Sequence, residues 1–166
     1  VDAAMAPGAP VIREGTADHS VPEGMHPNVV KYIDFGHGDV DAGFAAADLV
    51  REQTYKTEAT HQGYIEPHAC LGQLGSDGKG DMWVCTQGHW YIRRMCSAVL
   101  GIEASQLRVT ASGVGGGFGG KTTIVMEPLA LALSRKAGGR PVKLVMSRSE
   151  VLRATGPTAS ASMDVK

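Results

Sequence analysis

The chain has 166 residues, of which 43% are hydrophobic and 20% are charged, and its formal net charge is −1. Such a composition is typical of a globular protein that is long enough for one domain with a hydrophobic core. Because the charge is near zero and Lys and Arg are scattered, we expect neither nucleic acid nor a membrane surface as a partner.

The three cysteines, Cys70, Cys85 and Cys96, form no C-x-x-C pair. An odd number of such cysteines favours reduced thiols over a disulfide framework, and a self-contained iron–sulfur cluster would need four. The sequence contains neither a signal-peptide pattern nor an apolar run of about 18 residues. It begins at Val1 and not at Met. We therefore expect a cytoplasmic protein and a chain that is part of something longer.

Hydrophobic periodicity and turn residues predict the secondary structure. In chain order they predict a proline-rich arm at 1–27, a strand at 29–35, a helix at 40–47, strands at 50–60, 69–74 and 82–86, a helix at 90–100, a strand at 107–110, a helix at 124–137, a strand at 142–146 and an edge strand at 159–165. The fold class is α/β (α+β), a mixed sheet with at least two packed helices. We expect one domain at 28–166, preceded by the arm at 1–27.

Residues 113–121 (GVGGGFGGK) lie between a predicted strand and a predicted helix. Glycines on both sides of a single phenylalanine indicate a backbone that turns sharply and approaches a ligand closely, with its amides left free. Loops of this kind bind anions or oxo groups.

A nucleotide phosphate is one possible ligand, because the stretch from Gly115 through Thr122 matches the P-loop pattern G-x-x-x-x-G-K-[ST]. Two features count against a P-loop NTPase. Pro128 falls in the second turn of the predicted helix, where it would kink the segment. The strand predicted at 142–146 continues into Ser147 and Arg148 and not into a magnesium-binding acid.

A different match uses most of the chain. The glycine loop, the upstream Thr86-Gln87-Gly88 and the segment YIEPH at 64–68 occur in one order, and the similarity extends to NVVKYI (28–33), GDVDAGF (38–44) and GRPVK (139–143). In these motifs and their spacing the chain resembles the molybdenum-binding subunit of the xanthine dehydrogenase and aldehyde oxidase family. The resemblance implies the first molybdopterin-binding domain of that subunit.

The resemblance also implies a function. Enzymes of this family oxidise an aldehyde, an N-heteroaromatic ring or a related carbon centre with oxygen drawn from water. Their general-base glutamate lies in a C-terminal part of the subunit that has no counterpart here, so we expect the chain to be inactive by itself. The implied cofactor is molybdenum-molybdopterin, with a cytosine dinucleotide form possible. The resemblance places the [2Fe-2S] clusters and FAD on other domains or subunits. These, and the remaining domains of the molybdenum subunit, are the implied partners of this chain, together with a small-molecule substrate.

The resemblance assigns roles to individual residues. It places Gln87 beside the apical ligand of the molybdenum, and the backbone of Gly116, Gly117, Phe118 and Gly119 opposite an oxygen ligand. A carboxamide offers both a donor and an acceptor, which suits Gln87 for this position. The residue that follows GGFGGK lies on the substrate side. In purine-oxidising members this residue is a glutamate that binds the purine. In this chain the position is occupied by Thr122, so the resemblance disfavours xanthine as a substrate.

Four further polar residues leave their roles open. Pro67 restricts Glu66 to extended geometry, so that Glu66 and His68 lie on the same side of the chain and could, with His61, form a zinc site. We favour a structural carboxylate and imidazole that satisfy backbone groups. Lys121 lies near a phosphate or pterin oxygen, or caps exposed carbonyl groups.

Overall fold

The computed structural model describes residues 2–12, 15 and 18–166. The chain divides into two compact units, one formed by Val1–Glu58 with Ser160–Lys166 and the other by Ala59–Ala159. Within the predicted arm, residues 1, 13–14 and 16–17 lie outside the described residues. The boundary expected at residue 28 falls inside the first unit, and the domain boundary itself stays a prediction.

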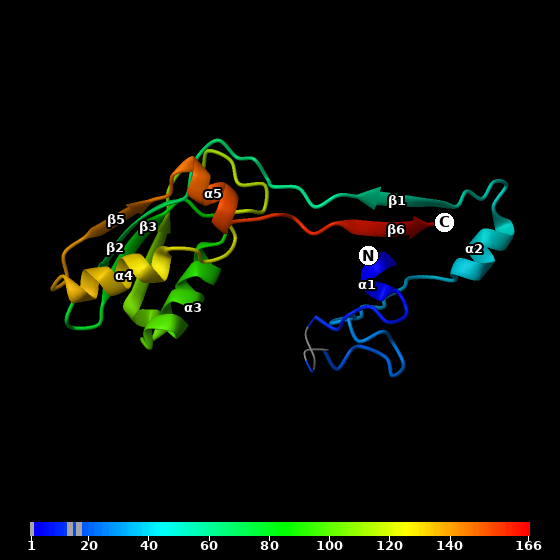
Figure 1. Cartoon of the computed structure of the whole chain (residues 1–166), viewed down its shortest axis with the longest axis horizontal. Helices are drawn as coiled ribbons and strands as arrows, with labels where there is room; N and C mark the ends of the chain where they lie inside the picture. The colour runs from blue at the N-terminus through cyan, green and yellow to red at the C-terminus, as the bar shows by residue number, and fades with distance from the viewer. Residues whose placement is uncertain (1, 13–14, 16–17) are drawn as a thin grey trace. The chain divides into compact units, whose positions relative to one another are not determined.

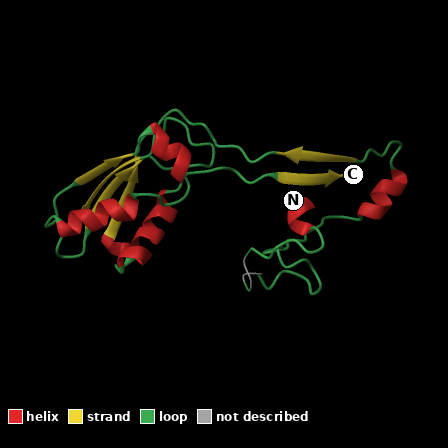
Figure 2. Cartoon of the chain, viewed as in Figure 1, coloured by secondary structure: helices red, strands yellow, loops and turns green. Residues whose placement is uncertain are grey.

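The second unit is built on a mixed sheet of four strands, as predicted (Figures 1 and 2). Its strands are β2 (Ala69–Leu74), β3 (Gly80–Val84), β4 (Leu107–Ala111) and β5 (Val142–Val145), in the order β4-β3-β2-β5. Strand β2 is antiparallel to both of its neighbours, whereas β3 and β4 are parallel. The connection between the two parallel strands runs through a helix, as parallel pairs require.

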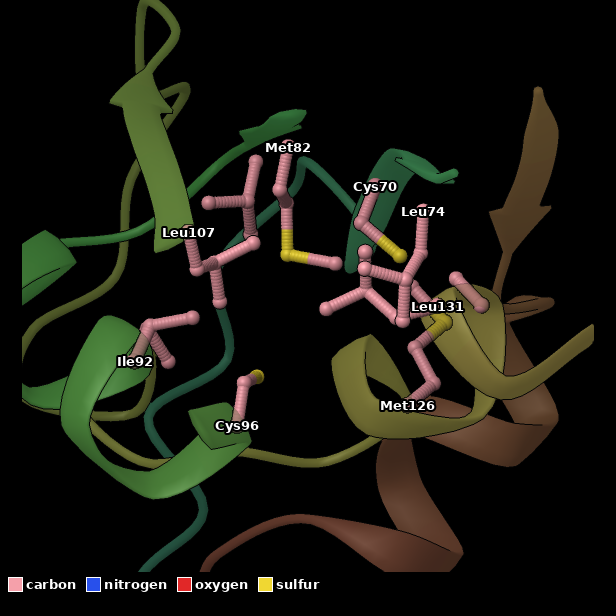
Figure 3. Close-up of a cluster of buried hydrophobic side chains, with 10 residues drawn as sticks. Cys70, Leu74, Met82, Ile92, Cys96, Leu107, Met126 and Leu131 are labelled. Carbon is pink, nitrogen blue, oxygen red and sulfur yellow. The ribbon is translucent and has the colours of Figure 1, made fainter. Parts of the chain in front are cut away.

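Two helices, α3 (His89–Leu100) and α4 (Glu127–Lys136), pack against each other and against one face of the sheet. Alternate residues of the strands point to this face and meet the apolar stripes of the helices. Figure 3 shows this core, whose buried members are Cys70, Leu74, Met82, Val84, Ile92, Cys96, Leu107, Met126, Ala130 and Leu131. The predicted two-helix packing is therefore confirmed.

Helix α4 begins three residues later than predicted. Pro128 lies in its first turn, where the missing amide would have had no intrahelical partner, so the predicted kink was wrong. The Glu127 carboxylate accepts hydrogen bonds from the amides of Val125 at 2.6 Å and Met126 at 3.0 Å. These bonds fix the start of the helix.

Helix α5 (Arg148–Ala154) was not predicted. It begins with a capping box, in which the Ser147 hydroxyl accepts from the Glu150 amide and the Glu150 carboxylate accepts from the Ser147 amide. The sequence signal was present, because Ser-x-x-Glu is the pattern of this cap. A short 3₁₀ helix, η1 (Ala104–Gln106), precedes β4.

The first unit contains the short helices α1 (Asp2–Met5) and α2 (Val40–Ala46), and the antiparallel pair β1 (Gln53–Thr57) and β6 (Ala161–Val165). Strand β6 confirms the predicted edge strand, and β1 is shorter than the predicted 50–60. The strand predicted at 29–35 does not form. Among the described residues no strand pairs with it, and the stretch makes isolated hydrogen bonds with Asp18 and Ser20 instead.

The three thiols lie in the second unit and are free and buried. Burial, and then the negative charge of Glu127, raise the pKa of both Cys70 and Cys96 to about 12. Cys85 accepts a hydrogen bond from the Ala69 amide at 3.1 Å. These cysteines therefore act as small core side chains.

Candidate functional site

The parallel pair β3 and β4 brings Gln87 and the glycine loop together. Val84 and Ala111 are paired at the ends of the two strands, so the residues that follow each strand leave the sheet at the same edge. The Gln87 amide donates to the carbonyl of Lys121 at 2.9 Å, and the Thr86 hydroxyl donates to the same carbonyl at 2.9 Å. The two predicted motifs thus form one site.

The side chain of Gln87 is oriented by the loop. Its Oε1 accepts from the amide of Gly119 at 3.1 Å and from that of Lys121 at 3.4 Å. Because the acceptor oxygen is used in this way, the Nε2 group points elsewhere, and within the described part of the chain it has no hydrogen-bond partner. Gln87 therefore offers a donor at an exposed position.

The loop itself presents a second group of donors. Gly116 has φ +94°, Phe118 has φ +48° and Gly119 has φ +87°. Left-handed backbone is costly at a phenylalanine, and Phe118 as a residue is 72% exposed, so packing in the core does not compensate for this cost. Across the described residues, the amides of Gly116, Gly117 and Phe118 donate to no acceptor. Successive free amides of this kind form a concavity for anions or other acceptors.

Close packing explains why several loop positions are glycine. A Cβ atom on Gly117 would lie 2.4 Å from Oε1 of Gln87, and one on Gly120 would lie 2.6 Å from Cε1 of Tyr64. At Gly115 it would lie 2.9 Å from Cβ of Glu66. Contacts under 3 Å force neighbouring atoms to move, so the loop can lie against Gln87, Tyr64 and Glu66 only with glycine there.

Lys121 and Glu66 form an ion pair beneath the loop. The Nζ of Lys121 lies 2.5 Å from Oε2 of Glu66, and the lysine side chain is 0% exposed. The Gly115 amide donates to the same oxygen at 2.9 Å. Burial by itself raises the pKa of Glu66, but the bonds from Lys121 and Gly115 outweigh it and hold that pKa below its ordinary value. The sequence reasoning missed this pair, since neither residue signals the other.

A chain of side-chain hydrogen bonds runs through buried groups next to this pair. The Tyr64 hydroxyl lies 2.8 Å from Nε2 of His68 and 2.9 Å from Oγ1 of Thr155. Thr155 donates to the carbonyl of Val151 at 2.7 Å, so it accepts from Tyr64, and Tyr64 in turn accepts from His68. Burial, and then the positive charge of Lys121, lower the pKa of His68, which keeps the imidazole neutral.

The zinc hypothesis finds no support in this arrangement. The described residues contain no group of three or more His, Cys, Asp or Glu side chains placed to hold a metal ion. His61 Nδ1 accepts from the Gly63 amide at 3.0 Å and its Nε2 lies 3.1 Å from Oγ1 of Thr155. The structural interpretation of His68 fits better, although its partner is Tyr64 and not the backbone.

The P-loop hypothesis also lacks the geometry that it needs. A P-loop lysine and the Ser or Thr after it open a helix, and the lysine reaches phosphate oxygens. Here α4 begins only at Glu127, and the Lys121 ammonium is buried against Glu66. Thr122 is exposed, and its hydroxyl donates to the Gly119 carbonyl at 3.0 Å.

The groups left free at this site match the needs of a molybdenum cofactor. They are the amides of Gly116, Gly117 and Phe118 and the Nε2 of Gln87, and all of them are hydrogen-bond donors. A molybdopterin cofactor carries phosphate, pterin and oxo oxygens, all of which are acceptors. The residues present therefore fit this group.

Among helices formed by the described residues, none has the length and hydropathy to cross a bilayer.

Known proteins agree with this class of site. The profile of the molybdopterin cofactor-binding domain matches residues 21–166. The chain is 31% identical over 148 residues to the xanthine dehydrogenase molybdenum-binding subunit of Escherichia coli O157:H7, covering 89% of this chain and 20% of that protein. It is 36% identical over 121 residues to the nicotinate dehydrogenase large molybdopterin subunit of Eubacterium barkeri, covering 73% and 28%.

A solved structure shows the same fold. The aldehyde oxidoreductase of Desulfovibrio gigas superposes with a TM-score of 0.62 at 28% identity, covering 76% of this chain and 14% of that chain. The chain thus spans a small part of the lengths of these relatives. It belongs to the molybdopterin cofactor-binding domain family, in the group of molybdenum-dependent oxidoreductases that includes the xanthine dehydrogenases and aldehyde oxidoreductases.

Proposed function

We propose that this chain forms one wall of the molybdenum cofactor site in an enzyme that oxidises a carbon centre with oxygen derived from water. The observation that carries the proposal is that four donors without an acceptor among the described residues, the amides of Gly116, Gly117 and Phe118 and the Gln87 Nε2, belong to two segments that contact each other where β3 and β4 end. When bound, the molybdenum cofactor supplies the two-electron oxidation. The chain's own groups orient it by donating hydrogen bonds to its acceptor oxygens, without reorganisation during the reaction.

The substrate class follows from the substrate-side position. Thr122 presents a small hydroxyl that is bonded to the Gly119 carbonyl, and it offers no carboxylate to a purine. Aldehydes and N-heteroaromatic carbon centres are therefore better candidates than xanthine. Among the relatives reported above, those named for nicotinate and aldehyde oxidation support these two classes, whereas the xanthine dehydrogenase subunit does not.

The general base is expected to come from another part of the enzyme. Glu66 is occupied by Lys121 and Gly115, and Glu127 is buried and bonded to two backbone amides. Neither carboxylate is placed to take a proton from a substrate. The chain alone is therefore expected to be inactive, and the base glutamate is expected in another part of the enzyme.

The remaining electron carriers are also assigned to partners. Three cysteines that are all buried cannot hold a [2Fe-2S] cluster, so iron–sulfur and FAD groups are expected on other domains or subunits. A cytosine dinucleotide form of the pterin is part of the same proposal. The free thiols suit a reducing compartment, which supports a cytoplasmic location.

The first test is the metal content of the native complex that contains this chain, measured by inductively coupled plasma mass spectrometry. We expect about one molybdenum atom per copy of the chain, together with iron on the partner domains. Absence of molybdenum from a complex of intact subunits would contradict the proposal.

The role of Gln87 is tested by Gln87→Glu in the same complex. This variant keeps an acceptor oxygen for the amides of Gly119 and Lys121 but removes the Nε2 donor. We expect turnover of an aldehyde or nicotinate to fall by about 10- to 100-fold, as is usual for groups that orient a metal centre, while the melting temperature changes little. Gln87→Ala, which also loses the acceptor, should lower turnover more than it lowers stability. Unchanged turnover in Gln87→Glu would remove Gln87 from the site.

A further inference from the structure

One carboxylate oxygen binds two groups of the glycine loop, one near each end. Oε2 of Glu66 accepts from the Gly115 amide at 2.9 Å and from Nζ of Lys121 at 2.5 Å. The Glu66 amide also donates to the Gly115 carbonyl at 3.3 Å. The loop therefore enters and leaves its turn at the same anchor.

Gln87 holds the same loop through a separate set of hydrogen bonds. The Gln87 side-chain oxygen accepts from the backbone amides of Gly119 and Lys121. The backbone amide of Gln87 donates to the Lys121 carbonyl. Lys121 is thus bonded through its backbone to Gln87 and through its side chain to Glu66. The amides between these anchors, at positions 116–118, are the ones left free.

The position of Lys121 is fixed in turn by the buried hydrogen-bond chain. Its Nζ lies 5.0 Å from the centroid of the Tyr64 ring, at the distance of a cation–π contact. Tyr64 is held by His68 and Thr155. A buried ammonium of this kind is expensive to desolvate, and well-packed apolar residues in place of such an ion pair are often at least as stable. The pair is therefore poorly explained by stability alone.

We propose that Glu66 and Lys121 are positioning residues, which hold the loop in the shape that presents the amides of Gly116, Gly117 and Phe118 to the cofactor. This inference rests on the proposed function and assigns to it two residues that do not themselves contact the cofactor. The two side chains act as one unit, since the Glu66 carboxylate binds the Gly115 amide near one end of the loop and the Lys121 ammonium at the other. Removing the lysine side chain frees one end, and removing the carboxylate frees both.

The experiment uses four variants of the chain in its native complex. They are Glu66→Gln, Lys121→Met, the double variant with both changes, and Glu127→Gln as a matched control. Glu127 is also a carboxylate that binds two amides, but those amides open α4 and lie outside the loop. The measurements are hydrogen–deuterium exchange of the peptide spanning 113–123, the molybdenum-to-protein ratio after gel filtration, and the melting temperature.

We expect the single variants to exchange at least about tenfold faster in this peptide, because a local opening then costs less, and to lose a measurable share of their molybdenum. Glu66→Gln should have the larger effect on melting temperature, because it leaves a buried ammonium unpaired. Lys121→Met leaves a partly exposed carboxylate that water can solvate. Glu127→Gln should lower the melting temperature without changing exchange in 113–123.

The double variant separates positioning from stability. It removes the unpaired buried charge, so its melting temperature should recover relative to Glu66→Gln, whereas loop exchange stays fast and molybdenum retention stays low. If loop exchange and molybdenum content return to wild-type values together with the melting temperature, the pair is only structural and the inference is overturned.

Failure of the proposed function would look different. A wild-type complex without molybdenum would contradict that proposal by itself, and the exchange data would still decide whether the pair holds the loop. Exchange in 113–123 that does not differ among wild type, Glu66→Gln and Lys121→Met would overturn the inference whatever the metal content.

Discussion

The two compact units differ in how they use their apolar residues. In the second unit, side chains from β2, β3, β4, α3 and α4 meet in one buried cluster. In the first unit, none of residues 4–12, 15, 18–58 and 160–166 is buried, and apolar side chains such as Ile33, Phe35 and Leu49 are largely exposed. The contrast shows that hydrophobic content does not make a core unless the elements also share a face.

The candidate functional groups follow the same division. The second unit contains Gln87, the glycine loop and the Glu66–Lys121 pair. There the parallel strands β3 and β4 fix the points at which the Gln87 segment and the glycine loop leave the sheet. Donors must be held in place to orient a cofactor, and rigid elements do this better than isolated loops. The division between the units therefore has consequences that matched substitutions can measure.

The largest effect is expected from leucine truncation in the two units. Leu131 of α4 is 0% exposed in the core, whereas Leu49 is 72% exposed. Leu131→Ala should lower the free energy of unfolding by about 2–5 kcal/mol, because a cavity adds to the lost burial. Leu49→Ala should change it by less than about 0.5 kcal/mol. Urea denaturation followed by tryptophan fluorescence measures the loss in Leu131→Ala, since Trp83 and Trp90 report on the second unit, and far-ultraviolet circular dichroism, which follows both units, measures Leu49→Ala. Similar losses of unfolding free energy in the two variants would contradict the claim that only the second unit has a hydrophobic core among the described residues.

A smaller effect is expected from the same glycine substitution in each unit. Gly117→Ala places a Cβ 2.4 Å from Oε1 of Gln87, and overpacking of this kind costs about 1–3 kcal/mol. Gly43 lies in α2 with no atom within 4 Å of a built Cβ, so Gly43→Ala should stabilise that helix by up to about 1 kcal/mol.

Thermal unfolding measures the loss in Gly117→Ala, and hydrogen exchange at residues 40–46 measures the local gain in Gly43→Ala. Cofactor retention should fall only in Gly117→Ala. Two variants that behave alike would show that the loop is less tightly packed against Gln87 than its distances indicate.

The smallest effect concerns pH. The pKa of His68 is lowered in the folded state by burial and then by the charge of Lys121. Unfolded chains bind a proton at this residue near pH 6.5 while the folded protein does not, so stability is fully present above about pH 6.5 and is lost as the pH falls toward the folded pKa. His68→Gln should remove this pH dependence, because glutamine does not titrate. Urea midpoints between about pH 5.5 and 7.5 measure it, and an unchanged slope in the variant would contradict the assignment.

Much of the second unit could be predicted because its signals are local. Strand β2 has the predicted bounds, and the pattern of α3 ends at Gly101, whose φ is +63°. The meeting of Gln87 with the glycine loop came from the family resemblance, since two loops that follow different strands carry no sign of their pairing. The strand predicted at 29–35 failed because a strand needs a partner, and alternation in one segment does not supply it.

The Glu66–Lys121 pair shows a second limit of the sequence. The residues are 55 positions apart, and Thr155 is 91 positions from Tyr64, so no spacing rule connects them. Both residues of the pair were singled out as polar groups of open role, and the chemistry of a carboxylate or an ammonium allows many partners. Only the close approach made possible by glycine at position 115 brings that carboxylate to the loop.

The buried thiols make the chain convenient for chemical labelling. Thiolates react with maleimides and thiols hardly do, and Cys70 and Cys96, with pKa values of about 12, form almost no thiolate near neutral pH. Cys85 is enclosed with them in the second unit. A cysteine introduced at an exposed position, such as Ser76 in the turn between β2 and β3, would therefore carry a fluorophore or spin label with little background. That turn lies at the opposite end of β3 from Gln87, so a probe there would report on binding without touching the site.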